Sequence, residues 1–518
     1  MLSTEFYKPM ADSFDAIIVG GGHNGLVAAC YLAKAGKRVA VLEKNSEFGG
    51  ATASVYAFSG VSAKLSRYSY LVALLPNQII TDLNLNFKTL SRKVSSYTPI
   101  GNSGILINRI FDDESKASIN DFTGNNKEAD SWQQFYNRMG EFAQKVAPTM
   151  LRPLPTETQI QDLVGEELWQ EFVIQPLSKT LEKYFSNDVI KGIVLTDGLI
   201  GTFASATERA ANICFIYHLI GNGTGEWKVP IGGMGVLISE LLALSESLGV
   251  TLLAETKIDK IIDTGDQVII ETRSKSFQSK VVIAGCSPHS LAKLTGDQPP
   301  RSLDGSQLKM NMVLNKLPRL KSGMDPKIAF SGTFHIDESY QQLENAFSEA
   351  KAGQIPSVIP AEMYCHTLTD PSILSDELQE SGAHTLTVFV LHTPASLFDH
   401  DHDERKSLVV KRVLAGLNKY LIDPIESCLA RDSAGKPCIE IKTPQELEIE
   451  IGLPRGNIFH GDLQFPWKTN DDPRKWGVET KSPRIFIGGA GAVRGGGVSG
   501  ISGHNAAMAA LERLAEIK

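Results

Sequence analysis

A glycine-rich loop between two short apolar runs constrains this chain more than any other part of its sequence. Residues 15–50 read DAIIVGGGHNGLVAACYLAKAGKRVAVLEKNSEFGG. The apolar runs 16–19 and 38–42 are typical of buried parallel strands, a helical pattern fills 26–36, and Glu43 closes the second run. Three glycines follow the first run in the spacing G-x-G-x-x-G: Gly20, Gly22 and Gly25. This order of elements predicts a dinucleotide-binding unit.

Each position of this unit has a physical role. Gly20 allows the tight turn out of the strand, and Gly22 has no Cβ to keep the backbone away from a pyrophosphate. Gly25 lets the helix pack closely on the strand, and the helix N-terminus offers N–H groups to the phosphates. Glu43 lies 23 positions after Gly20, close to the ~20 expected of the acid that binds a ribose hydroxyl.

The unit alone does not choose between NAD and FAD. Gly49 and Gly50 follow the acid, and a glycine pair suits a backbone that passes close to a cofactor continuing beyond the pyrophosphate. This favours FAD, although the pair taken alone is also typical of an ordinary turn. We include Lys44, Ala51 and Thr52, which flank these positions, in the predicted cofactor site.

Length, charge and cysteine usage exclude several classes. The 518 residues are 42% hydrophobic, enough to bury large cores, and the net charge of −8 argues against a general nucleic-acid binder. No run approaches the ~18 apolar residues of a membrane span. The six cysteines form no C-x-x-C pair, which argues against a dithiol centre or a zinc ribbon and fits a reducing compartment.

The N-terminal stretch 1–14 has neither signal-peptide nor Arg-rich transit-peptide character. We expect a cytoplasmic protein, with the mitochondrial matrix as the alternative for a eukaryotic chain. Peripheral membrane contact and homo-oligomers stay open.

The rest of the chain alternates between two kinds of segment. Helical spacing in 131–147 and 163–185 predicts a helical insertion, and the polar, acidic stretch 112–130 is typical of a loop or solvated surface. A predicted helix at 236–248 then returns the chain to the first sheet. Further strands are predicted at 250–253, 268–271, 280–284, 310–314 and 385–392.

A second glycine loop lies near the C-terminus. A short strand, 484–487, precedes a loop in which seven of the thirteen residues from Gly488 to Gly500 are glycine, and a helix is predicted at 505–517. Strand, glycine loop and helix N-terminus again make an anion-binding construction. We expect its backbone donors to contact the flavin.

The run DHDHDE at 399–404 raises the alternative of a metal site, because alternating His and Asp project onto one face of a strand. The basic helical pattern that starts at Arg405 favours a solvated helix N-terminus instead. We predict no metal.

These motifs together resemble the phytoene-desaturase-type FAD oxidoreductases. The resembling segments occur in the family's order along nearly the whole chain. They are VGGGHNGLVAA (19–29), LEKNSEFGGA (42–51), SRYSYLVALL (66–75), VLTDGLIG (194–201), WKVPIGGMGVL (227–237), GLPRGNIFH (452–460) and GGAGAVRGGGVSGISGHNAA (488–507).

The resemblance implies an α/β fold: a split Rossmann-like FAD-binding domain of the glutathione-reductase/amine-oxidase type with an inserted α+β substrate domain. The FAD-binding domain is expected to comprise 12–86, 226–290 and 446–518, and the substrate domain 87–225 and 291–445. The resemblance also adds Asn24 to the pyrophosphate site and places adenine near the backbone of Ile258. It places the flavin against Gly491, Gly497, Val498 and Ser499.

One feature departs from the family's pattern. Its members commonly carry His-Pro in the final loop, where this chain has Val493-Arg494, so any role of that His-Pro is in doubt. In addition, no second G-x-G-x-x-G follows a strand, which leaves a separate NAD domain unsupported.

The resemblance implies an oxidoreductase, a dehydrogenase or desaturase that acts on an apolar, isoprenoid-like substrate by hydride transfer to flavin. His460 and Asp462 are the predicted general-base candidates, with structural hydrogen bonding as the alternative for His460. Arg494 is expected to stabilise anionic reduced flavin or a polar substrate group. A flavoprotein with a regulatory or partner-binding role and a redox-neutral polyene isomerase remain alternatives.

Overall fold

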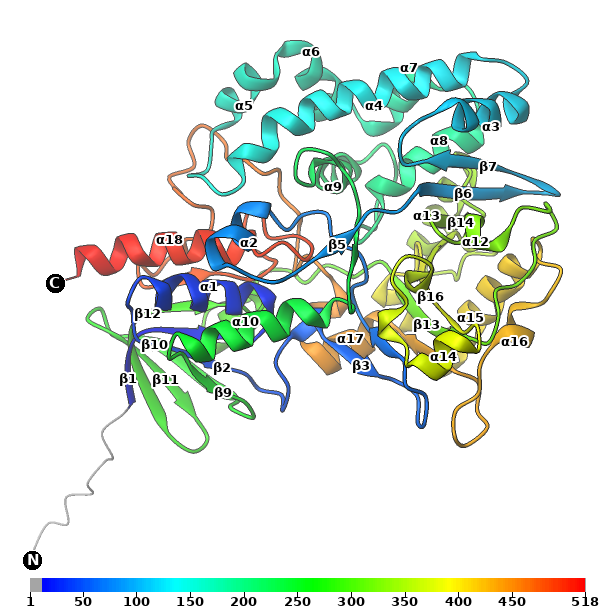
Figure 1. The fold of residues 1–518 in the computed structure, drawn as a ribbon. Coiled ribbons are helices and arrows are strands. Elements are labelled where there is room, and N and C mark those ends of the chain that lie inside the picture. Colours follow the sequence, from blue (N-terminus) through cyan, green and yellow to red (C-terminus); the bar gives the residue numbers. More distant parts are fainter. Residues whose placement is uncertain (1–11, 518) are drawn as a thin grey trace, which may run out of the picture.

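Among the described residues, two seven-stranded sheets, two small two-stranded sheets, the helices that flank them and a cap of helices make up the molecule (Figure 1). The structure, a computed structural model, describes residues 12–517. Residues 1–11 and Lys518 lie outside the described residues, and with them most of the N-terminal stretch whose character was interpreted above.

The first sheet contains the predicted dinucleotide-binding unit. Its order is β10-β11-β12-β1-β2-β9, and β18 pairs with the second half of β12. The pairs among β9, β2, β1, β12 and β18 are parallel, whereas β10 and β11 form an antiparallel extension. The bounds are β1 Asp12–Val19, β2 Val39–Leu42, β9 Thr251–Leu253, β10 Ile258–Asp263, β11 Val268–Thr272, β12 Ser276–Ala284 and β18 Ile485–Ile487.

Two helices cover one face of this sheet. α1 (His23–Lys34) connects β1 to β2, and α18 (Ile501–Glu516) packs beside it, as Figure 1 shows in blue and red. Small side chains in both helices bring them close to the strands, because alanines of α1 and α18 share one apolar core with β1 and β2. α10 (Gly235–Ser247) packs on the other side of α1. The strand–helix–strand order predicted for 16–42 is therefore confirmed.

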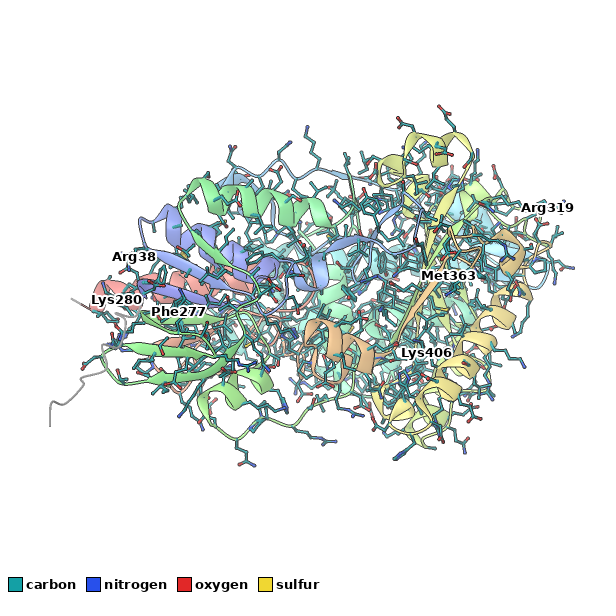
Figure 2. The ribbon with its side chains drawn as sticks, turned by 90° about the horizontal axis from the view of Figure 1, so that it is seen from below. Arg38, Phe277, Lys280, Arg319, Met363 and Lys406 are labelled. Atoms are coloured by element: carbon teal, nitrogen blue, oxygen red, sulfur yellow. The ribbon has the colours of Figure 1, made fainter. Side chains whose placement is uncertain are left out.

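The second sheet lies at the other end of the molecule. In Figure 2, Arg38, Phe277 and Lys280 mark one end of the first sheet. They lie far from Met363 and Arg319. The order is β17-β13-β16-β15-β14-β6-β7, and only β14 and β6 pair in parallel among these neighbours. The bounds are β6 Val94–Ile100, β7 Ser103–Asn108, β13 Leu308–Leu314, β14 Thr333–Ile336, β15 Ala361–Tyr364, β16 His384–Val390 and β17 Ile439–Lys442.

One face of the second sheet carries an apolar core that helices cover. Met310, Phe334, Met363 and Val388 belong to this core, together with Val409 and neighbours from α15. The helices after β13 are α12 Pro326–Ala329, α13 Tyr340–Lys351, α14 Asp376–Glu380, α15 His402–Asn418, α16 Ile425–Cys428 and α17 Pro444–Ile451.

The helical cap corrects two expectations. The polar stretch 112–130 is not a loop: Asp112 caps α3 by accepting a hydrogen bond from the Ser115 N–H, and Ile119 packs into the core. The region 163–185 is broken into short helices, with breaks at Gly165 and before Pro176. The bounds are α3 Asp113–Thr123, α4 Lys127–Val146, α5 Glu157–Val164, α6 Glu166–Trp169, α7 Leu177–Tyr184, α8 Asp188–Leu195 and α9 Arg209–Ile220.

The two sheets draw on different parts of the sequence. Every strand of the first sheet lies within 12–86, 226–290 or 446–518, and every strand of the second within 87–225 or 291–445. The naming of these units as FAD-binding and substrate domains stays a prediction.

The DHDHDE run lies at the start of α15, where Asp399 forms an ion pair with Arg455. Across residues 12–517 the structure shows no group of three His, Cys, Asp or Glu side chains arranged to hold a metal ion. Within the same residues, no helix has the length and apolar character needed to cross a membrane.

Close contact between α1 and α18 generates the first prediction. A Cβ at Gly503 would lie 2.0 Å from the backbone oxygen of Asn24, so Gly503→Ala must push the helices apart and cost roughly 1–3 kcal/mol. Gly140→Ala in α4 is the matched control, because its Cβ meets nothing within 4 Å and it should stabilise by about 0.5–1 kcal/mol. We expect the thermal midpoint to fall for the first variant and to hold or rise for the second. Equal midpoints for Gly503→Ala and the parent protein would contradict this packing.

Candidate functional site

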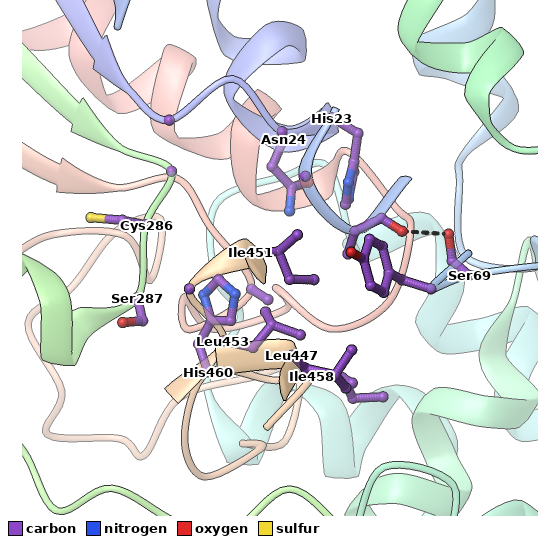
Figure 3. A pocket seen from close by; sticks show the side chains of 18 of the residues that line it. His23, Asn24, Ser69, Cys286, Ser287, Leu447, Ile451, Leu453, Ile458 and His460 are labelled. Carbon is purple, nitrogen blue, oxygen red and sulfur yellow. Dashed lines mark hydrogen bonds between the residues drawn. The ribbon is translucent and has the colours of Figure 1, made fainter. Parts of the chain in front are cut away.

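A cavity of about 400 Å³ extends from the glycine loop of the first sheet to one face of the second sheet. Figure 3 shows His23 and Asn24 on one side of it and His460, Leu453 and Ile451 on the other. The volume lies within the range of small-molecule and cofactor sites. Segments from Val19 to Val498 contribute to its lining, so the two sheets and α17 build it together.

Glu43 binds the glycine loop next to the N-terminus of α1. Its side chain is buried, and its two oxygens accept hydrogen bonds from the backbone N–H groups of Gly21, at 2.8 Å, and Asn45, at 2.9 Å. The N–H of Gly49 donates to the carbonyl of Gly21 at 2.9 Å. The predicted acid and the predicted glycine pair therefore meet the glycine loop in one place.

Gly22 fits a closely bound phosphate group. Its φ of −73° is one that any residue adopts, and a Cβ built on it would meet no atom within 4 Å. Nothing in the protein itself therefore requires glycine here, whereas a pyrophosphate lying against the backbone does. α1 also has no side-chain cap and no acid in its first turn, which leaves its N-terminal N–H groups for an anion.

Four buried polar atoms on the cavity wall have no hydrogen-bond partner among the described residues: His23 Nε2, Asn24 Oδ1, Ser306 Oγ and His460 Nδ1. Unpaired buried polar groups are costly, and a polar ligand removes that cost. A hydrogen bond fixes the orientation of the His23 ring, because its Nδ1 lies 2.8 Å from Thr52 Oγ1. The open glycine loop and these atoms suit the phosphates, ribityl hydroxyls and ring edges of FAD.

Most of the predicted cofactor residues line this cavity, and a few lie just behind its wall. Those on the wall are Gly20, Gly22, Asn24, Gly25, Glu43, Lys44, Gly50, Ala51, Ile258, Gly497 and Val498. Those behind it are Gly49, Thr52, Gly491 and Ser499. Their contacts to FAD stay proposals.

Two of the three predicted catalytic residues lie off the cavity. Asp462 is exposed and lies off the cavity. Arg494 is completely buried away from the cavity, and its Nη1 donates to the backbone carbonyls of Thr149, Met150 and Arg152 at 2.6–3.0 Å. The arginine therefore ties the C-terminal glycine loop to the helical cap.

His460 does reach the cavity. Burial lowers its pKa to about 4, so the ring is neutral at pH 7 and offers its unpaired Nδ1 for hydrogen bonding. With so low a pKa it is a poor proton acceptor at neutral pH.

Sequence reasoning missed the inner end of the cavity. Lys309, Phe389 and Tyr364 line it from the second sheet, and Tyr70 and His218 complete it. Lys309 Nζ lies 5.3 Å from the ring centroids of both Tyr70 and Phe389. The signal was present as alternation in LKMN and AEMY, but such strands are expected to turn their polar side chains to solvent.

Comparison with known proteins finds one family model and several similar proteins. A family model described as an NAD(P)-binding Rossmann-like domain matches residues 18–72. An uncharacterized protein of Mycobacterium tuberculosis is 44% identical over 97% of this chain and 98% of its own length. Pyridine nucleotide-disulfide oxidoreductase domain-containing protein 2 of Rattus norvegicus is 29% identical over 95% and 92%. A carotenoid 3,4-desaturase of Haloarcula japonica is 26% identical over 55% and 58%.

Solved structures share the fold. Wild-type putrescine oxidase bound to putrescine aligns with a TM-score of 0.57 at 17% identity, over 98% of this chain and 99% of that one. An oxidoreductase from Methanosarcina mazei aligns with a TM-score of 0.54 at 15% identity, over 96% and 99%. At these identities the likeness establishes the fold and nothing finer.

Gly22→Val tests the phosphate site. The backbone conformation accepts the substitution and the new side chain points into open space, so the protein without cofactor should unfold at the parent midpoint. FAD binding should be abolished, because the side chain occupies the pyrophosphate position. Gly140→Ala, remote from the cavity, should bind FAD normally. Stoichiometric FAD in the valine variant would show that the phosphates lie elsewhere.

Glu43→Gln tests the acid. The amide keeps the shape but has one acceptor oxygen for two backbone N–H groups, and it loses a charge-assisted bond worth roughly 1.5–3 kcal/mol. FAD affinity should fall about ten- to a hundred-fold, whereas the visible spectrum of the protein that still binds should barely change. Glu47→Gln, exposed on the same loop, is the matched control. A shifted flavin spectrum with unchanged affinity would reverse the proposed orientation of the cofactor.

Proposed function

Because this chain belongs to the phytoene-desaturase-type family of FAD-dependent oxidoreductases, we propose that it dehydrogenates a small molecule with a large apolar part. Its cofactor is FAD, as in the desaturase and oxidoreductase relatives. An isoprenoid-like substrate is the finer form of this proposal, and the carotenoid desaturase among the relatives supports it.

The observation that carries the proposal is the continuity of the cavity. One space joins the dinucleotide loop at Gly22 to the second sheet at Phe389. A substrate at the inner end therefore shares one cavity with the far end of the cofactor. Apolar side chains from α17 and the segment after it form one wall: Leu447, Ile451, Leu453 and Ile458 (Figure 3).

Bound FAD supplies the two-electron oxidation by accepting a hydride at its ring. The residues of this chain bind and orient the substrate and the cofactor. The apolar wall orients the substrate and keeps water out, and it favours a substrate that exchanges water for apolar contact. Neutral His460 offers its unpaired Nδ1 to a bound ligand at the cavity wall, and the glycine loop with Glu43 holds the cofactor.

An anaerobic assay tests the proposal. The purified protein should be yellow with one FAD per chain, and members of a panel of isoprenoid hydrocarbons, carotenoid precursors and polar amines should be compared as reductants. We expect isoprenoid-like compounds to bleach the oxidised flavin and amines to leave it unchanged, because the wall offers apolar contact.

Each alternative gives a different result. If no compound bleaches the flavin faster than buffer alone, a regulatory or partner-binding flavoprotein is favoured and the dehydrogenase proposal fails. If a polyene changes geometry without any acceptor being consumed, the protein is a redox-neutral isomerase. Bleaching by amines alone would overturn the apolar substrate.

A further inference from the structure

One face of the second sheet is polar and yet buried. Along β13, Lys309 and Asn311 alternate with Met310 and Met312, and only the methionines enter the apolar core under the helices. Lys309 is 3% exposed. Burying titratable groups costs free energy unless they are paired or used, so this face demands an explanation.

Strand register sets the titratable side chains in a row. Lys309 is opposite Phe389, Phe389 is opposite Glu362, and Glu362 is opposite His335. Side chains in such directly paired positions lie on the same face of a sheet. The row therefore crosses four strands, from β13 to β14. Tyr364 lies two residues from Glu362 on the same face and lines the cavity.

Tyr364 connects the cavity to Glu362. Its hydroxyl donates a hydrogen bond to Glu362 Oε1 at 2.6 Å. Glu362 is 3% exposed, and in the part of the chain that the structure describes no arginine or lysine lies within ion-pair distance of it. A carboxyl in this position binds a proton readily.

Further acid–base groups lie near Tyr364 and Glu362. His335 Nδ1 and a carboxyl oxygen of Glu338 share a short hydrogen bond, and both side chains are buried. From the helical cap, His218 Nε2 lies 3.5 Å from Asp197 Oδ1. The titratable and charged groups that face Glu362 or Tyr364 are Tyr70, Arg92, Asp197, His335 and Glu338, with Lys309 further along the row.

We propose that Tyr364 and Glu362 form a proton relay that takes the proton the substrate loses in the cavity. The inference rests on the proposed dehydrogenation, which removes a hydride and a proton. As the substrate's hydride passes to FAD, the bond from a neighbouring substrate atom to its hydrogen breaks, and that proton joins the Tyr364 oxygen. The original phenolic proton moves to the Glu362 carboxylate. The substrate is oxidised by two electrons, FAD is reduced by two, and Glu362 ends protonated.

The electrostatics favour this direction of transfer. Burial, with the nearby Glu338, raises the pKa of Glu362 to about 8, and burial raises the pKa of Asp197 to about 7. A base with a pKa near the working pH transfers protons most effectively. Because only the ionised carboxylate accepts a proton, relay activity should rise as the pH increases through about 8. His460, with a pKa of about 4, is a much weaker acceptor.

A direct test needs no substrate. Infrared spectra of the FAD-loaded protein should contain the carbonyl band of a protonated, buried carboxyl group that disappears as pH increases through about 8. Glu362→Gln should remove this band and leave any bands of Asp197 and Glu338, two further buried carboxyls whose pKa is raised by burial. Tyr364→Phe should shift its midpoint upward, because the carboxylate loses the hydroxyl donor.

Two variants provide matched controls. Tyr97→Phe deletes another buried hydroxyl, one that bonds to Ser322 away from the cavity. Glu171→Gln changes a buried carboxyl that is paired with Arg138. Both should leave the band and its midpoint unchanged. A carboxyl spectrum that Glu362→Gln leaves unchanged, or a midpoint that Tyr364→Phe does not move, overturns the relay.

The kinetic test uses whichever compound of the anaerobic panel bleaches the flavin. Tyr364→Phe should slow flavin reduction by about 10²–10⁴-fold with FAD content unchanged, Glu362→Gln should abolish the rise with pH, and Tyr97→Phe should match the parent. Unchanged rates in the first two variants overturn the relay. If no compound bleaches the flavin, the dehydrogenase proposal fails on its own account, and the infrared band still decides whether Tyr364 and Glu362 are coupled.

Discussion

The shape of the loop between β1 and α1 depends on a buried carboxylate. Glu43 accepts hydrogen bonds from the N–H groups of Gly21 and Asn45, and so fixes the end of β2 against the glycine loop. From the other side, Gly503 of α18 lies so close to Asn24 that no side chain fits between the helices. Segments far apart in the sequence thus hold one short loop open, and the cavity begins there.

The same geometry explains why the cavity continues to the second sheet. The chain leaves the first sheet and later re-enters it. The segments between these points contribute elements that face the glycine loop across the cavity. α17 and the residues that follow it bring apolar side chains and His460, whereas β13, β15 and β16 bring Lys309, Tyr364 and Phe389. One end of the space is therefore suited to phosphates and ribose, and the other to a substrate with apolar and polar parts.

Much of this arrangement could be predicted from local patterns. The dinucleotide-binding unit can be recognised from the sequence because its glycine spacing, its acid and its apolar runs all lie close together in the chain. The α3 helix was missed because its stabilisation comes from the Asp112 cap and the burial of Ile119, which its polar composition conceals. The fate of Arg494 could not be foreseen either, because the carbonyls that bind it belong to residues 149–152. The polar row of the second sheet was missed for a related reason: alternation shows the two faces of a strand, but not that α15 and its neighbours bury one face while the other face lines the cavity.

The structure of the FAD-loaded protein, determined by crystallography, tests the account most directly. We predict an extended cofactor with its pyrophosphate against Gly22, its adenosine ribose at Glu43, and its ring between the loop at Gly497 and the side chains of His460 and Tyr364. The reversed orientation, with the ring at Glu43, would contradict the account, as would a ring screened from Tyr364 by protein atoms.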